Sequence, residues 1–131
     1  MKIHKNILDI AIDVAKKSDV TRGKVGAVCF TNTKNVIAFA HNKIVYGKTH
    51  KRIFTVHAEV SLLAKLVRLR ASSRFGLKNL NILVVRYKPE TDGLAIAKPC
   101  ANCQHYLKLA GVRVFYTDAN GDIMPLTFRR K

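Results

Sequence analysis

The chain has 131 residues, of which 48% are hydrophobic, and this length fits one compact domain over residues 1–131. No apolar run approaches the roughly 18 residues of a membrane span, so we expect no signal peptide and no membrane anchor. The 24 Lys and Arg residues against 8 Asp and Glu give a net charge of +16, which few small-metabolite enzymes need and which favours nucleic acid as the partner class.

The N-terminal part of the chain predicts a helix followed by a strand hairpin. Apolar residues recur at helical spacing over residues 3–15, and Gly23 lies a few positions beyond that pattern. Two apolar segments follow, Val25–Thr31 and Val36–His41, and the polar stretch 32–35 separates them. This pattern is typical of two mostly buried strands joined by a turn.

The middle of the chain predicts a second helix and a central strand. Thr55 can cap a helix that runs to about Arg70 and carries a wide apolar face. Residues Leu80–Tyr87 form a nearly continuous apolar run, as expected for a strand covered on both faces. A loop over residues 88–98 follows.

The C-terminal part predicts a third helix and a hairpin. Pro99 can open a helix over residues 100–110 that Gly111 stops, and Val112–Thr117 then forms a strand. Asn120-Gly121 is a strong hairpin signal, so residues 123–128 should return antiparallel at the edge of the sheet. The whole order of elements predicts an α/β layered domain, with helices on both faces of one mixed sheet.

Two short motifs at predicted helix starts carry the chemistry. They are His57-Ala58-Glu59 and Pro99-Cys100-Ala101-Asn102-Cys103. Cys100 and Cys103 are three positions apart, so both sulfurs project from one side of a helical turn, as a chelating pair requires. A helix N-terminus also favours thiolate over thiol. The motifs therefore predict a metal site.

The number of ligands distinguishes a catalytic from a structural site. One imidazole and two thiolates leave one tetrahedral position of zinc for water, the arrangement of a catalytic centre. Glu59 lies two residues from His57, so it should reach that water without being a ligand and move its protons. The His and Glu alone are also typical of an ordinary helix start, and C-x-x-C alone is typical of a structural zinc site or a redox pair. Together, the two motifs favour catalysis.

HAE and PCANC, on two helices separated by a strand, resemble the H-x-E and P-C-x-x-C signature of the zinc-dependent cytidine and deoxycytidylate deaminase superfamily. The element order resembles that family over nearly the entire chain. The resemblance implies a three-layer cytidine deaminase-like fold with a five-stranded mixed sheet and a C-terminal antiparallel hairpin, with Zn²⁺ as cofactor. It also implies roles for five residues: His57, Cys100 and Cys103 as ligands, Glu59 as proton shuttle, and the backbone near Ala58 and Cys100 facing the base.

Two further residues have a functional and a structural interpretation. His41-Asn42-Lys43 is similar to the segment in which the family's nucleotide and tRNA deaminases hold the sugar with an asparagine, which implies substrate binding for Asn42. The alternative is a plain turn residue, since asparagine is common where strands end. Cys29, in the middle of a predicted strand, is expected to be a buried small hydrophobe.

Basic and aromatic residues interleave in the two loops that should rim the pocket. Such a mixture suits a phosphate backbone with stacked bases, although a solvated basic loop is the alternative. The candidate nucleic-acid contacts are Lys48, Lys51, Arg52, Lys88 and Lys98, and Phe54 is a candidate substrate contact.

These features predict an enzyme that deaminates cytosine to uracil by hydrolysis, in single-stranded nucleic acid. One alternative is a deaminase of free cytidine, deoxycytidine or dCMP in pyrimidine salvage. Another is a zinc-containing nucleic-acid-binding protein without turnover, although Glu59 has no use in such a protein. Cytosine is favoured over adenine because Cys103-Gln104 and the Asn120-Gly121 hairpin resemble the cytidine deaminases.

Cysteine usage and the family resemblance give the remaining expectations. Three cysteines, two of them in C-x-x-C spacing, indicate a metal or redox site in a reducing compartment, so we expect a cytoplasmic protein. The family's small members commonly assemble, which implies a homo-oligomer. The positive charge has its own alternative explanation, as an effect on solubility.

Overall fold

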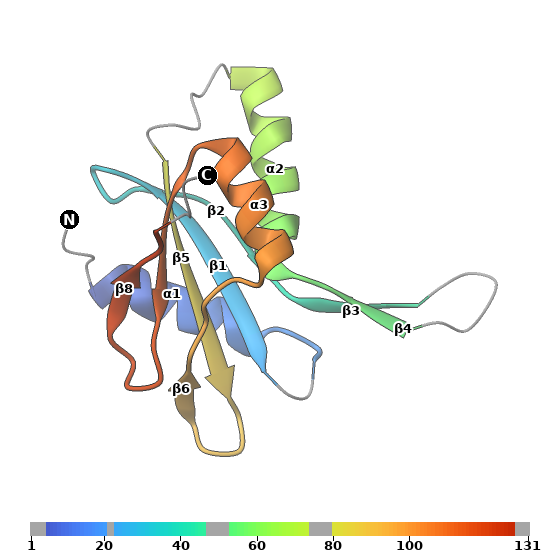
Figure 1. Ribbon diagram of the computed structural model, residues 1–131, viewed down its shortest axis with the longest axis vertical. Coiled ribbons are helices and arrows are strands. Elements are labelled where there is room, and N and C mark those ends of the chain that lie inside the picture. Colours follow the sequence, from blue (N-terminus) through green and yellow to red (C-terminus); the bar gives the residue numbers. More distant parts are fainter. Residues whose placement is uncertain (1–4, 21–22, 47–52, 74–79, 128–131) are drawn as a thin grey trace.

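The structure, a computed structural model, describes residues 5–20, 23–46, 53–73 and 80–127 (Figure 1). In these residues a central sheet separates one helix from two others, which gives three layers. The helices are α1 (Lys5–Lys16), α2 (Ala58–Ser73) and α3 (Ala101–Ala110). The strands are β1 (Lys24–Thr31), β2 (Val36–His41), β3 (Lys43–Tyr46), β4 (Ile53–Val56), β5 (Leu80–Lys88), β6 (Gly93–Ala95), β7 (Arg113–Thr117) and β8 (Ile123–Pro125).

The main sheet is mixed and has the strand order β2-β1-β5-β7-β8. Only β5 and β7 pair in parallel, while the other neighbours pair antiparallel. These are the five predicted strands, and the β7–β8 pair is the predicted C-terminal hairpin with Pro125 at the sheet edge. A sixth strand, β6, pairs antiparallel with the end of β5.

Residues of β1 and β5 alternate between the two helix layers. Ala27 and Cys29 of β1 pack in the core that α2 and α3 cover, and Val28 and Phe30 pack in the core that α1 covers. β5 alternates in the same way with residues 82–85. Burial on both sides explains the continuous apolar runs in the sequence. Burial also raises the pKa of the Cys29 thiol to about 12, which keeps it protonated and unreactive.

Two helix features follow directly from the sequence. Four apolar residues of α1 are buried against the sheet, at the spacing of one helix face: Ile7, Ala11, Val14 and Ala15. Helix α3 ends at Gly111, which has a φ of 76° and donates its N–H to the carbonyls of Leu107 and Lys108. This left-handed cap is the stop that the sequence predicts.

The prediction of a helix cap at Thr55 was wrong. Thr55 lies in β4, which pairs with β3 in a separate two-stranded sheet, and α2 begins at Ala58. β-branched and aromatic residues dominate both strands, and these residue types favour extended backbone over helix. In Figure 1 this ribbon extends away from the three layers. The loop predicted over residues 88–98 also contains an unpredicted strand, β6.

No helix in the described part of the chain is long and apolar enough to span a membrane.

Gly26 of β1 provides a test of the packing between α1 and the sheet. A Cβ at this position would lie 2.5 Å from the Ala11 carbonyl oxygen and 2.7 Å from the Ala15 amide nitrogen, both backbone atoms of α1. We expect Gly26→Ala to lower the free energy of unfolding by about 1–3 kcal/mol or more, because helix and strand must separate. Urea unfolding measures this.

Gly93→Ala is the matched control, since the nearest atom there is the Thr91 side-chain oxygen at 3.3 Å. An equal loss of stability in both variants would show that the close approach of Gly26 to α1 does not determine the free energy of unfolding.

Candidate metal centre

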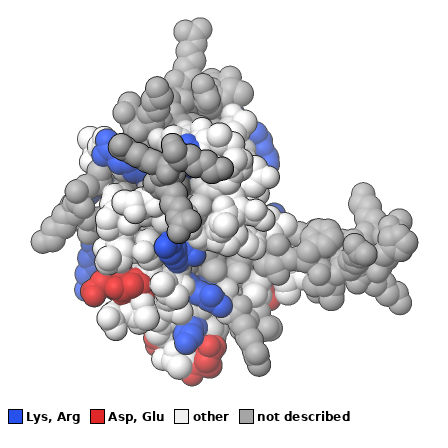
Figure 2. Space-filling view, viewed as in Figure 1, with Lys and Arg blue, Asp and Glu red and all other residues white. Residues whose placement is uncertain are grey.

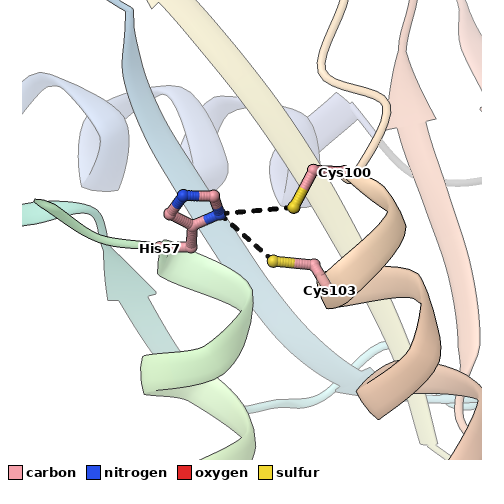
Figure 3. A group of neighbouring side chains, drawn as sticks. All are labelled: His57, Cys100 and Cys103. Carbon is pink, nitrogen blue, oxygen red and sulfur yellow. Dashed lines mark hydrogen bonds between the residues drawn. The ribbon is translucent and has the colours of Figure 1, made fainter.

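The two sequence motifs meet at the starts of α2 and α3. His57 immediately precedes α2, Cys100 is the N-terminal cap residue of α3, and Cys103 lies in the first turn of α3. Figure 3 shows the three side chains pointing toward one another from the two helices. Leu62 of α2 and Leu107 of α3, both fully buried, belong to the same core cluster, which anchors the helices on one face of the sheet.

The geometry of the three side chains fits a tetrahedral metal. His57 Nδ1 lies 3.2 Å from Cys103 Sγ and 3.7 Å from Cys100 Sγ, and the three ligand atoms all lie within 4.8 Å of one another. Usual zinc bond lengths, with tetrahedral angles, separate a nitrogen and a sulfur ligand by about 3.5 Å. The side chains therefore need only small adjustments to hold a zinc ion.

The surroundings of Cys103 disfavour its thiolate form when no cation is bound. Burial raises the pKa of this thiol, and the Glu59 charge and the Cys100 sulfur raise it further. The expected helix N-terminal stabilisation of thiolate is therefore outweighed here by loss of solvent. A bound divalent cation reverses this balance, because a thiolate ligand is deprotonated on binding.

Glu59 lies beside the metal ligands and is only 5% exposed. Burial raises its pKa, while a hydrogen bond to its own backbone, the charge on His57 and a hydrogen bond from Cys103 lower it in part. A carboxyl group with a raised pKa exchanges protons closer to neutral pH than an exposed one does. Glu59 is thus a candidate proton carrier beside the metal ligands.

The pocket beside these residues has a volume of about 280 Å³, near the lower end of the range for small-molecule sites. It contains the predicted residues Asn42 and Ala58 together with Glu59 and His57. Its complete lining is Val20, Gly23, Val25, Asn42, His57, Ala58, Glu59 and Arg86.

Asn42 has a structural role as well as a place in the pocket wall. Its Oδ1 accepts hydrogen bonds from Ser18 Oγ at 2.6 Å and from the Val25 amide at 2.9 Å. Its Nδ2 donates to the Gly23 carbonyl at 3.0 Å. Asn42 is 6% exposed, so it is not a plain exposed turn residue: it ties three segments together behind the pocket.

The candidate nucleic-acid contacts are only partly described. Lys88 and Lys98 are exposed, and neither lines the pocket described above. Lys48, Lys51 and Arg52 lie outside the described residues, and Phe54 belongs to β4, with a side chain that is not described. In the described part of the face in Figure 2, basic and acidic groups lie side by side near the β5–β6 end.

Arg86 lines the pocket but was missed in the sequence. It stands at the end of the apolar run Leu80–Val85, and the β1–β5 register places it opposite Val25. A single charge at the end of a buried run is the sequence signal that could have identified Arg86. The pairing with β1 that brings Arg86 to the pocket cannot be predicted without the strand register.

A second cavity lies on the outer side of α2 and α3 and is larger, at about 370 Å³. Its lining carries no carboxylate, imidazole or thiol, so it offers no set of metal ligands, and Tyr106 is the one lining residue with an ionisable side chain. The lining residues are Val60, Leu63, Ala64, Val67, Tyr106 and Ala110.

Comparison with known proteins gives one family and one fold. Residues 1–118 match the family model described as the cytidine and deoxycytidylate deaminase zinc-binding region. Among solved structures, the chain is similar to a cytidine deaminase from Burkholderia pseudomallei, with a TM-score of 0.65 and 19% identity over 96% of this chain and 93% of that chain. No curated protein matches. The resemblance, the fold and the zinc cofactor expected from the sequence are thereby confirmed.

Removal of single cysteines tests the metal centre. We expect the wild-type protein to retain one zinc ion per chain after dialysis, and Cys100→Ala and Cys103→Ala to fall well below that ratio, because each loses one of three ligands. Atomic absorption on protein of verified fold measures this. Cys29→Ala is the control and should keep its zinc; equal retention in all variants would contradict the site.

Burial of Glu59 predicts a gain in stability when its charge is removed. A pKa raised in the folded state costs stability as pH rises from the ordinary carboxyl value, about 4.3, through the raised folded value. We therefore expect metal-free Glu59→Gln to match the wild type below this window and to have a higher Tm above it. Thermal unfolding with chelator, from acid to neutral pH, measures the difference.

Glu90→Gln, at an exposed glutamate, makes the same chemical change as a control and should leave Tm unaltered. A Glu59→Gln difference that is constant over the whole pH range would contradict the burial argument.

Proposed function

This chain belongs to the cytidine and deoxycytidylate deaminase zinc-binding family, and on that premise we propose that it deaminates cytosine to uracil by hydrolysis. The observation that carries the proposal is the pairing of a three-ligand metal set with a buried carboxyl group, Glu59, in one pocket. A structural zinc site has four protein ligands and needs no proton carrier. Among the described residues, the metal group consists of His57, Cys100 and Cys103 alone.

The chemistry divides between the cofactor and the side chains. When bound, zinc lowers the pKa of a coordinated water roughly from 15.7 to 7. The Glu59 carboxylate accepts a proton from the attacking water and gives it to ring nitrogen N3 of cytosine. A second proton passes through Glu59 to the exocyclic amino group. A C4–O bond forms, the C4–N bond breaks, and ammonia leaves.

Other residues of the pocket orient the base. The backbone at Ala58, which is fully buried, faces the reacting ring in this proposal. Asn42 has one amide hydrogen that makes no hydrogen bond to a described residue, and in this proposal it contacts the sugar. Because Asn42 is already fixed by Ser18, Val25 and Gly23, it offers that contact without loss of side-chain entropy on binding.

Cytosine in single-stranded nucleic acid is the proposed substrate. The net charge of +16 supports a polymer, because a positive field attracts polyphosphates and accelerates their arrival. A free pyrimidine nucleoside or nucleotide is the second candidate. It is supported by the family description, which names cytidine and deoxycytidylate, and by the similar structure, which is a cytidine deaminase.

Glu59→Gln tests the mechanism directly. We expect kcat to fall by about 10²–10⁴-fold, with zinc content unchanged, because Gln retains the size of the side chain but cannot accept the proton. The assay measures uracil products by mass spectrometry. Wild-type turnover in the Glu59→Gln variant would contradict the role of Glu59.

The same assay separates the two substrate classes. Wild-type protein is incubated with cytidine, deoxycytidine, deoxycytidylate and single-stranded DNA and RNA, each at two salt concentrations. Uracil formed only in the polymers, and less at high salt, supports nucleic acid as substrate. Product formed from the monomers alone, independent of salt, supports the free nucleoside or nucleotide.

A further inference from the structure

Arg86 is the one permanently charged cation among the described residues that line the pocket. It lies near the end of β5, opposite Val25 of β1 on one side and Ala95 of β6 on the other. The side chain is exposed, so its charge remains available at the mouth of the pocket that contains Glu59.

The Arg86 guanidinium lies against Gly23. A Cβ at Gly23 would lie 2.5 Å from Arg86 Nη2, 2.6 Å from Nε and 2.8 Å from Cζ. The guanidinium group therefore lies directly on the Gly23 backbone, in space that any side chain would fill. The φ of 66° at Gly23 also favours glycine. The side-chain amide of Asn42 donates a hydrogen bond to the Gly23 carbonyl.

The charge of Arg86 is not neutralised within the described part of the chain. No hydrogen bond or ion pair joins its guanidinium to another described residue, and Arg86 is absent from the influences that shift the pKa of Glu59. A guanidinium presents five donors in a planar fork, which matches the oxygens of a phosphate group. A guanidinium at the pocket that is unpaired among the described residues is suited to an anionic part of the substrate.

We propose that Arg86 binds a phosphate group of the substrate and so makes the pocket selective for phosphorylated cytosine compounds over the bare nucleoside. This inference rests on the proposed deamination, because it assigns the part of the substrate that lies outside the reacting ring. The phosphate belongs either to a free nucleotide or to the backbone of a polynucleotide, and the experiment distinguishes these sources.

The test compares Arg86→Gln with wild type on three substrates: deoxycytidine, deoxycytidylate and a single-stranded oligonucleotide with one cytosine. A hydrogen bond to a charged group contributes enough that we expect kcat/KM to fall by about 10–100-fold for a phosphorylated substrate. Deoxycytidine turnover should not change. Arg113→Gln removes the same charge from an exposed position on β7 and should affect none of the three.

Each outcome supports or overturns the proposal. A fall for deoxycytidylate assigns Arg86 to a free nucleotide, and a fall for the oligonucleotide alone assigns it to the polymer backbone. An equal fall for deoxycytidine, or no fall for either phosphorylated substrate, overturns the role of Arg86 while deamination stands.

If the wild type converts none of the three, the proposed function fails instead. Calorimetric binding of deoxycytidylate and deoxycytidine to the zinc-loaded protein, with and without Arg86→Gln, then still tests the phosphate contact. Loss of the difference in affinity between the two compounds in the Arg86→Gln protein supports the contact, and an unchanged difference overturns it.

Discussion

The packing of α2 and α3 side by side on one face of the sheet fixes the distance between His57 and the two cysteines. Each ligand lies at or near the start of its helix, so a shift of either helix along its axis moves a ligand atom directly. Leu62 of α2 and Leu107 of α3 lie fully buried in the core that also contains Ala27 and Cys29 of β1. The hydrophobic core thus determines the position of the metal ligands, and the metal in turn links the two helices once it binds.

The burial that positions the site also destabilises the charged forms of its polar groups. Loss of solvent is the largest cause of the raised pKa at both Glu59 and Cys103, and each group also influences the other. A stable protein without function would place apolar residues at both positions. A divalent cation favours deprotonation of its thiolate ligands, so the metal offsets part of the cost at Cys103. The cost at Glu59 remains, and the proposed role of Glu59 in proton transfer requires the raised pKa that comes with it.

Local pattern was sufficient for most of the fold and for the metal centre. The apolar runs of β1 and β5, the helical spacing of α1 and the stop at Gly111 are each short-range signals that agree with the final packing. The β3–β4 ribbon was missed because Thr55 satisfies the rule for a helix cap equally well when its partner strand is unknown. Arg86 was missed for a related reason: its contact with Gly23 depends on the register between β1 and β5, and no local pattern specifies register between distant strands.

Charge acts on this protein at two length scales with different physical consequences. The net charge of +16 produces a long-range field that speeds the arrival of polyanions and weakens as salt screens it. In our proposal, the Arg86 guanidinium beside Gly23 acts at contact distance on one phosphate group, and this short-range contact is less sensitive to salt. The first effect needs no particular geometry, and the second depends on Gly23, Asn42 and the strand register together. Salt dependence of binding therefore reports on the surface field, whereas discrimination between a nucleotide and its nucleoside reports on the pocket.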